Sequence, residues 1–201
     1  MNKSDRVSNK HRKTNETEIN IKINLDGTGQ YDIKTGNGML DHLLAQIARH
    51  GLMDLNIQAS GDIEVGYHHL VEDIAITLGQ TINEAISDGQ GITRIGHTYV
   101  PLDEALVLTV VDCGGRGYAC IESPLTDSDL GGLPSDLIRH FMEAFAIEAK
   151  INLHLKVLSG INNHHIAEAS FKSLARSLKT AISFDPRRGN TVASTKGTIN
   201  A

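Results

Sequence analysis

The pattern of hydrophobic and polar positions predicts the same order of elements twice: strands, a helix, a strand and a second helix. In the first half, apolar and polar residues alternate in three expected strands, at residues 19–25, 31–34 and 55–59. Apolar residues at helical spacing predict two helices, at residues 39–50 and 68–87. Asp26-Gly27 is a turn sequence that would join the first two strands as a hairpin.

The second half repeats this order. Its expected strands lie at residues 91–101, 105–111, 117–121 and 151–157. One helix is expected after Pro134-Ser135-Asp136, and another from about His164 to Ser183. We therefore predict an α+β fold of two duplicated βαβ-type half-domains, residues 14–90 and 91–184, which together form one domain. Each half would be a small mixed sheet covered by helices.

Both ends of the chain lack this pattern. Residues 1–13 are polar and basic without periodicity, and we expect them to be a flexible arm. Residues 185–201 form a polar tail without a core pattern, which is typical of disorder. The run Ser194-Thr195-Lys196-Gly197 within the tail could instead wrap an anion with backbone N–H groups, a hydroxyl and an ammonium.

Composition restricts the classes of function. With 201 residues, of which 40% are hydrophobic, the chain is long enough to bury a sizeable core. A net charge of -5 and 4% aromatic residues disfavour a nucleic-acid surface, so any anion site must be local. Cys113 and Cys120 form neither a Cys-x-x-Cys motif nor a disulfide framework. Without a signal core or an apolar span, the expected location is the cytoplasm.

A five-residue motif occurs once in each half, at the start of a predicted helix. Residues 68–72 read His-His-Leu-Val-Glu, and residues 164–168 read His-His-Ile-Ala-Glu. Each half also has an upstream histidine on its preceding predicted helix, which is His42 in the first half and His140 in the second. The apolar residues that follow the two motifs align as well, so the chain is an internal duplication.

Helix geometry turns this motif into a prediction of metal binding. Residues three and four apart share a helical face, so each motif can bring an imidazole and a carboxylate together. Adjacent residues lie about 100° apart, so the two imidazoles of a pair should point at different ions. Imidazole and carboxylate suit Zn, Mn, Fe, Co or Ni, and six-coordinate Mn or Fe leaves positions open for substrate. The predicted ligands are His42, His68, His69, Glu72, His140, His164, His165 and Glu168.

The simplest division of these ligands gives two ions, each with three histidines and one glutamate. Because the pairs point in several directions, we expect some sites to be completed across a subunit boundary of a symmetric oligomer. The residues alone leave other interpretations open. The His-His pairs could cap helix starts, Glu16 could be a solvated strand end, and Arg94 and Arg116 could form surface ion pairs instead of a phosphate clamp. Lys172 could be a solvated lysine, and the tail could be disordered.

Five sequence runs together resemble the imidazoleglycerol-phosphate dehydratase family, namely 38–42, 68–73, 101–106, 164–169 with Phe171-Lys172, and 194–197. The resemblance extends from Arg12 to Lys196. It implies a ribosomal protein S5 domain 2-like fold and the dehydration of imidazole glycerol phosphate to imidazole acetol phosphate in histidine biosynthesis. It also implies two Mn²⁺ ions per active site and a homo-oligomer of 24 subunits built from trimers. A metal-dependent hydrolase and a non-catalytic metal-binding oligomer remain the alternatives.

The resemblance also implies roles for individual residues. It gives the same eight metal ligands as the repeated motif. The implied substrate-binding residues are Glu16, Gln46, Arg94, Arg116, Lys172, Ser194, Thr195 and Lys196. Glu16 is the main candidate for proton transfer, with Glu72, Glu168 and Asp103 as alternatives. The expected chemistry stabilises a substrate imidazolate with manganese and passes through a diazafulvene-like intermediate.

Overall fold

The computed structural model describes residues 6–126 and 128–199. Each half of the chain folds into a four-stranded mixed sheet with two helices, and the two sheets have strand orders β1-β2-β4-β3 and β5-β6-β8-β7. The elements of the first half are β1 (Val7–Lys13), β2 (Thr17–Asn24), β3 (Tyr31–Lys34), α1 (Gly38–Gly51), β4 (Asp54–Gly61) and α2 (His68–Ile86). Those of the second half are β5 (Ile95–Leu102), β6 (Ala105–Asp112), β7 (Tyr118–Glu122), α3 (Leu137–Glu148), β8 (Asn152–Ser159) and α4 (Asn163–Ile182). The predicted duplication and α+β class are confirmed.

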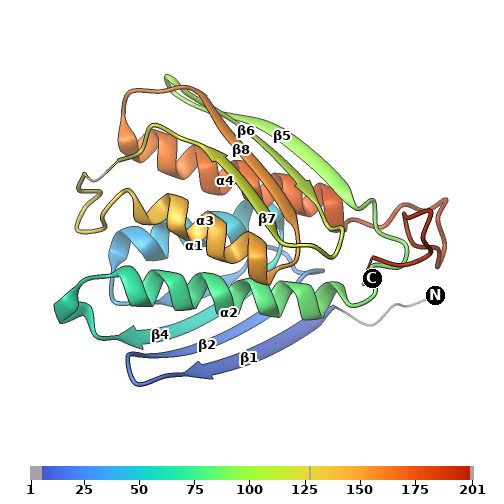
Figure 1. Ribbon diagram of the computed structural model, residues 1–201, viewed down its shortest axis with the longest axis horizontal. Coiled ribbons are helices and arrows are strands. Elements are labelled where there is room, and N and C mark those ends of the chain that lie inside the picture. Colours follow the sequence, from blue (N-terminus) through green and yellow to red (C-terminus); the bar gives the residue numbers. More distant parts are fainter. Residues whose placement is uncertain (1–5, 127, 200–201) are drawn as a thin grey trace.

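The two sheets form the outer layers of the molecule, and the helices lie between them (Figure 1). Within each half the long helix covers the sheet, with α2 on β1 and β2 and α4 on β5 and β6. Between the halves, α1 packs against α4 and α2 packs against α3. The buried apolar residues form one cluster that includes residues of both halves. Among the described residues, no helix has the length and apolar character needed to cross a membrane.

Period-two alternation explains why β2 packs as it does. Ile19, Ile21 and Ile23 are fully buried on the helix-facing side, while the residues between them are polar and face outward. Burying an isoleucine side chain contributes about 1.5–3 kcal/mol, so this face holds the strand in register. The same alternation occurs in β6, where Val107 and Val111 are fully buried.

Residues 7–13 correct the prediction of a flexible arm. They form β1, which pairs with β2 in antiparallel register from Val7↔Asn24 to Lys13↔Glu18. The inward face of β1 carries long polar side chains, which hides it from a hydrophobicity pattern. Lys10 and Arg12 reach acidic residues on α2, with ion-pair distances of 2.7 Å to Glu84 and 2.8 Å to Asp73. Residues 1–5 of the predicted arm lie outside the described residues.

The predicted hairpin at Asp26-Gly27 is also wrong, although both strands exist. β4 lies between β2 and β3, so β3 pairs in parallel with β4 and has no contact with β2 in the sheet. The connecting loop is held to β4 by Asp54, whose Oδ1 accepts hydrogen bonds from Thr28 N at 2.8 Å and Gln30 N at 2.9 Å. The loop crosses the end of β4 because this carboxylate satisfies its backbone groups.

The described part of the tail, residues 185–199, follows a defined path. An isolated antiparallel bridge joins Gln90 to Val192, and Ile199 is 7% exposed. The interpretation of this segment as disordered is therefore wrong. The tail folds back to the end of α2 because Ile199 fills the space above Gly89, where an added Cβ would lie 2.4 Å from its side chain.

Candidate metal and substrate site

Both repeated motifs lie at helix starts, as predicted. The first backbone N–H groups of α4 donate to the Asn162 side chain, from His164 N at 2.9 Å and from His165 N at 3.3 Å. Because an asparagine caps this helix, its two imidazoles are not needed for capping. The cap on α1 is again an asparagine, since Asn37 accepts from Leu40 N at 2.9 Å.

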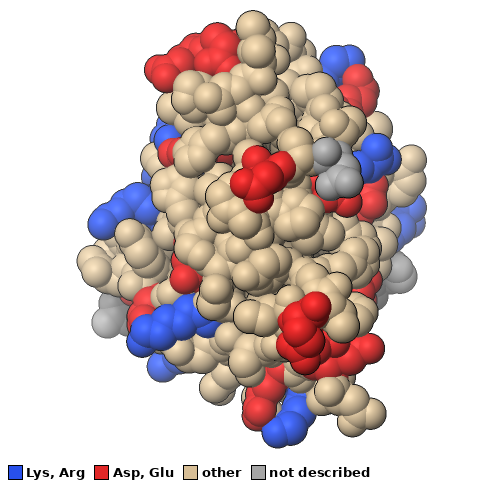
Figure 2. All heavy atoms as spheres, turned by 90° about the vertical axis from the view of Figure 1, so that its left-hand side faces the viewer, with Lys and Arg blue, Asp and Glu red and all other residues tan. Residues whose placement is uncertain are grey.

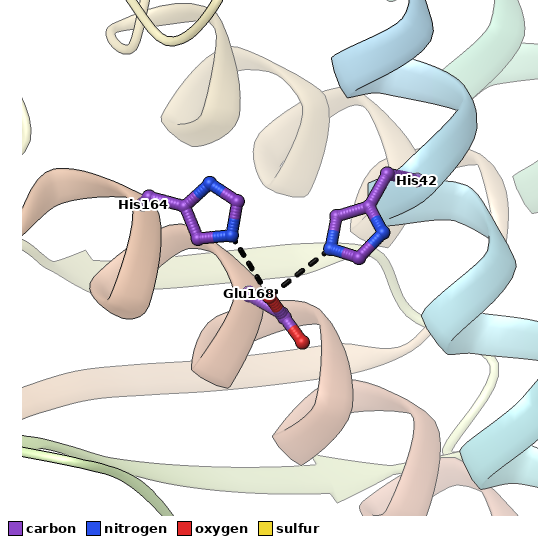
Figure 3. Close-up of side chains that lie close together, drawn as sticks. All are labelled: His42, His164 and Glu168. Carbon is purple, nitrogen blue, oxygen red and sulfur yellow. Dashed lines mark hydrogen bonds and ion pairs between the residues drawn. The ribbon is translucent and has the colours of Figure 1, made fainter.

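His42, His164 and Glu168 form the first cluster (Figure 3). Both imidazole Nε2 atoms lie 3.0 Å from the same carboxylate oxygen, Oε2 of Glu168. The second oxygen of Glu168 lies 2.6 Å from Nζ of Lys172, one helical turn further along α4. Two imidazoles and a carboxylate thus converge on one point, with a lysine behind the carboxylate.

The electrostatics of the first cluster favour an ionised carboxylate. Partial burial raises the pKa of Glu168, but the hydrogen bonds and positive charges of Lys172 and His42 outweigh it and lower the pKa to about 2. The cluster therefore presents an anionic oxygen to any cation that binds between the rings.

His68, Glu72 and His140 form the second cluster. The rings of His68 and His140 are 4.3 Å apart, and Nε2 of His140 lies 3.4 Å from Oε1 of Glu72. This Nε2 is buried and has no hydrogen-bond partner among the described residues. A buried ring nitrogen without a hydrogen-bond partner lowers the stability of the fold, so the position of this Nε2 is that expected of a metal ligand.

Each cluster draws its ligands from both halves of the chain. His42 of the first half joins the second motif, and His140 of the second half joins the first motif. The exchange follows from helix packing, because α1 lies against α4 and α3 lies against α2. In both motifs it is the histidine four residues before the glutamate that converges with it, which the sequence left open.

The other histidine of each pair points elsewhere, which confirms the predicted divergence. The rings of His68 and His69 are inclined by 90°, and those of His164 and His165 by 84°. Consequently each cluster has two histidines within one chain, where the simplest count predicted three. Three of the predicted ligands form each cluster, whereas His69 and His165 lie outside the clusters.

Two carboxylates that the sequence analysis did not select hold the rings of His69 and His165. Nδ1 of His69 lies 3.1 Å from Asp62, and Nδ1 of His165 lies 2.7 Å from Glu104. These hydrogen bonds raise the pKa of both imidazoles. Backbone N–H groups of the β8–α4 loop, together with His165, lower the pKa of Glu104 to about 2. The only signal for these two carboxylates in the sequence was their closeness to residues already selected. Glu104 follows Asp103, an alternative for proton transfer, and Asp62 precedes His69 by one short loop.

Five of the predicted substrate-binding residues line one cavity of about 380 Å³, namely Arg94, Arg116, Ser194, Thr195 and Lys196. Arg94 also makes a bidentate ion pair with Asp112, at 2.7 and 3.0 Å, and donates to the carbonyl of Ala193 at 2.8 Å. Arg94 thus forms an ion pair and also lines the cavity, and the pair orients its guanidinium beside the tail.

The remaining predicted substrate residues lie with the histidines. Nε2 of Gln46 donates to the backbone carbonyl of His42 at 3.0 Å, and Lys172 contacts Glu168. Glu16, in the β1–β2 turn, places Oε2 3.8 Å from Nδ1 of His69.

The cavity at the tail and the two clusters occupy opposite ends of the molecule. The tail lies at the end where α2 and α4 finish, whereas the motifs lie where these helices begin (Figure 1). A helix of 19 residues such as α2 is about 28 Å long, from a rise of about 1.5 Å per residue. Figure 2 shows the end of the molecule where α2 and α4 begin. This face has separate acidic patches, and its basic residues lie mainly toward the edges.

Comparison with known proteins identifies the family of the chain. The family model described as imidazoleglycerol-phosphate dehydratase matches residues 35–178. The protein of that name from Dehalococcoides mccartyi is 49% identical over 194 residues, covering 96% of this chain and 97% of the relative. Its namesake from Herminiimonas arsenicoxydans is 50% identical over 188 residues, covering 94% of this chain and 95% of the relative.

Solved structures give the same result. The crystal structure of imidazoleglycerol-phosphate dehydratase from Staphylococcus aureus superposes with a TM-score of 0.81 at 35% identity, covering 89% of this chain and 99% of that one. The structure of IGPD from Pyrococcus furiosus gives a TM-score of 0.80 at 37% identity, covering 94% and 99%. The chain therefore belongs to the imidazoleglycerol-phosphate dehydratase family and is a hydro-lyase of histidine biosynthesis.

Proposed function

We propose that the chain dehydrates imidazole glycerol phosphate to imidazole acetol phosphate with two Mn²⁺ ions per active site. Membership of the family supports the reaction, and one structural observation carries the metal proposal. Two clusters of imidazole and carboxylate each gather donor atoms within 4.8 Å of one another. Each cluster is assembled from both halves, so the duplicated fold itself builds the two sites.

The donor set fits manganese. All donors are imidazole nitrogens and carboxylate oxygens, which suit a six-coordinate ion with positions left for substrate. Burial raises the pKa of the Cys113 thiol to about 12, so it does not act as a thiolate ligand. The residues that would hold the ions are His42, His164 and Glu168 in one cluster and His68, Glu72 and His140 in the other. Ions held there would supply Lewis-acid stabilisation of negative charge on the substrate's imidazole ring.

We further propose that each active site is shared between subunits of a homo-oligomer. Two observations support this. The anion cavity lies about one α2 length from the clusters, too far for one substrate molecule to reach within a single chain. The rings of His69 and His165 are also inclined away from those of His68 and His164, and both side chains are partly exposed, so each can complete the coordination of an ion held mainly by another subunit. The family resemblance suggests an assembly of 24 subunits built from trimers.

In this proposal the chain's own residues bind the phosphate and move protons. Arg94, Arg116 and Lys196 hold the phosphate by charge-assisted hydrogen bonds, which fixes the imidazole against the clusters. Glu16 is the proton-transfer group for the substrate side chain, because its side chain is 55% exposed and its Oε2 lies 3.8 Å from Nδ1 of the predicted ligand His69. Lys172 keeps Glu168 ionised and oriented through its 2.6 Å contact.

The test is the formation of a ketone product from imidazole glycerol phosphate. The protein is stripped with a chelator, divided, and refilled with Mn²⁺ or left without metal. We expect turnover only in the refilled sample, with the released product detected as a ketone by its hydrazone. Absence of turnover in a refilled, fully assembled protein would contradict the proposed reaction, whereas full turnover in the stripped sample would contradict the need for metal.

A further inference from the structure

The two histidines outside the clusters, His69 and His165, are both held through the same ring atom. Nδ1 of His69 lies 3.1 and 3.2 Å from the two oxygens of Asp62, and Nδ1 of His165 lies 2.7 Å from Oε2 of Glu104. An ionised carboxylate only accepts hydrogen bonds, so Nδ1 must carry the hydrogen in both rings. In the neutral ring the lone pair is then on Nε2, the ring atom opposite this contact, which is a metal-binding atom. Nε2 of His165 lies 3.6 Å from Oδ2 of Asp103, beyond hydrogen-bond distance.

The two halves reach this arrangement from different positions. Asp62 lies in the loop between β4 and α2, seven residues before its histidine. Glu104 lies in the turn between β5 and β6 and is 61 residues away from its histidine. Simple duplication of one ancestral contact would have put both carboxylates at matching positions. The contact occurs in both halves although its position differs, which argues that the orientation of the ring is what each half retains.

The counterpart of Glu104 in the first half is Glu16. Thr17 and Ala105 are the buried first residues of β2 and β6, and each begins the alternation of its strand. Glu16 and Glu104 directly precede them, in the turns that enter these strands. In the second half this glutamate holds the histidine. In the first half Asp62 does so, and Glu16 remains 3.8 Å from Nδ1 of His69, beyond hydrogen-bond distance.

We infer that Asp62 and Glu104 are positioning residues that fix the imidazoles of His69 and His165 with Nε2 as the metal-binding atom. The inference rests on the proposed function, because it assigns how His69 and His165 serve as ligands. It also explains why Glu16 and Glu104, in the corresponding turns before β2 and β6, have different roles. Since Asp62 takes over the histidine of the first half, Glu16 is released for proton transfer, whereas Glu104 is fully occupied.

A competing interpretation makes Glu16, Asp62 and His69 a further metal site, since their donor atoms also lie within 4.8 Å of one another. An ion there would bind Nδ1 of His69 and leave the hydrogen on Nε2. That tautomer could not bind a metal through Nε2 at a subunit boundary. The two interpretations therefore predict different stoichiometries, two ions per chain for the positioning role and three for an additional site.

The first test variant is Glu104→Gln. In the native protein Oε1 of Glu104 accepts from Ile161 N at 3.1 Å and Asn162 N at 2.8 Å, while Oε2 faces His165. The glutamine carbonyl can keep the two backbone contacts, and its NH₂ group then donates to Nδ1. This moves the ring hydrogen to Nε2 without removing the side chain. We expect about 10–100-fold weaker Mn²⁺ binding at one of the two sites, as for the loss of other outer contacts of metal-binding histidines.

The second and third variants are Asp62→Asn and Asp62→Ala. Both oxygens of Asp62 lie near Nδ1 of His69, so asparagine can still turn its carbonyl toward the ring, and binding should stay close to that of the unaltered protein. Alanine removes the acceptor and should weaken one site as Glu104→Gln does. Glu122→Gln is the matched control, because Glu122 pairs at 2.7 Å with Lys156 on the second sheet.

Free Mn²⁺ is measured by electron paramagnetic resonance as the stripped proteins are titrated, and the melting temperature is recorded without metal. Weaker binding at one site in Glu104→Gln and Asp62→Ala, with melting temperatures equal to the control and recovery in Asp62→Asn, supports the positioning role. Unaltered binding in both variants overturns it, as does equal loss in Asp62→Asn and Asp62→Ala or a stoichiometry of three. If the unaltered protein binds Mn²⁺ but does not dehydrate its substrate, the proposed function alone fails.

Discussion

The contact between α2 and α3 at Gly79 can be perturbed with a single methyl group. A Cβ at this position would lie 2.8 Å from both the carbonyl O of Phe145 and the amide N of Ala149, and 2.9 Å from Cβ of Glu148. Since two of these are backbone atoms, the helices themselves must separate. Overpacking of this kind lowers the free energy of unfolding by about 1–3 kcal/mol. Because backbone atoms obstruct the added methyl group, we expect about 3 kcal/mol for Gly79→Ala. The higher helix propensity of alanine stabilises the fold by about 1 kcal/mol, so the net decrease in the free energy of unfolding is about 2 kcal/mol.

Thermal denaturation with and without Mn²⁺ checks this prediction. A loss of about 2 kcal/mol lowers the melting temperature of a chain of this size by about 4–8 °C. The control is Gly38→Ala at the start of α1, where nothing lies within 4 Å of an added Cβ and no decrease is expected. Because α3 carries His140, Gly79→Ala should also weaken Mn²⁺ binding at the cluster of Glu72 more than at that of Glu168. Melting and metal binding like those of the control would refute the reasoning.

Three further perturbations address the site and the stability of the first sheet. Glu16→Gln should leave metal content intact and strongly lower turnover, and normal turnover would refute its role in proton transfer. Arg94→Lys replaces the guanidinium that Asp112 orients at the anion cavity with an ammonium that cannot keep both contacts to Asp112. Steady-state kinetics should therefore give a raised KM for the phosphorylated substrate at unchanged Mn²⁺ content. Backbone hydrogen bonds from Gln30 and Thr28 lower the pKa of the Asp54 carboxyl. The ionised carboxylate therefore adds to the free energy of unfolding above about pH 4, and this stabilisation is lost as the pH falls through the lowered pKa. Asp54→Asn should therefore cost about 1 kcal/mol in urea unfolding at pH 7, and a deficit that did not shrink toward acid pH would contradict this sign.

Much of the fold could be predicted because local patterns coincide with burial. Ile19, Ile21 and Ile23 alternate in the sequence and are fully buried on one side of β2. β1 was missed because its inward side chains are Lys10 and Arg12, whose partners are known only once α2 is in place. The order of strands was missed for a similar reason, since the insertion of β4 beside β2 depends on a long-range pairing that no turn sequence specifies.

In the candidate site, too, the features set by local sequence could be predicted and those set by long-range packing could not. The divergence of His68 and His69 follows from the rotation per helical residue, and the sequence predicted it. The exchange of His42 and His140 between the halves depends on which helices pack together, and that is set by the whole core. Asp62 lies near its histidine in sequence, but its role became visible only when the loop placed its carboxylate beside Nδ1.

The central claim is that the two clusters assembled from both halves hold the manganese ions. X-ray diffraction from crystals of the Mn²⁺-refilled protein, recorded on either side of the manganese absorption edge, tests it most directly. We predict two anomalous peaks per chain, one beside Glu72 and one beside Glu168, each completed by a His69 or His165 side chain from a neighbouring subunit. Peaks at other positions, or none at these two clusters in crystals of catalytically active protein, would contradict the account.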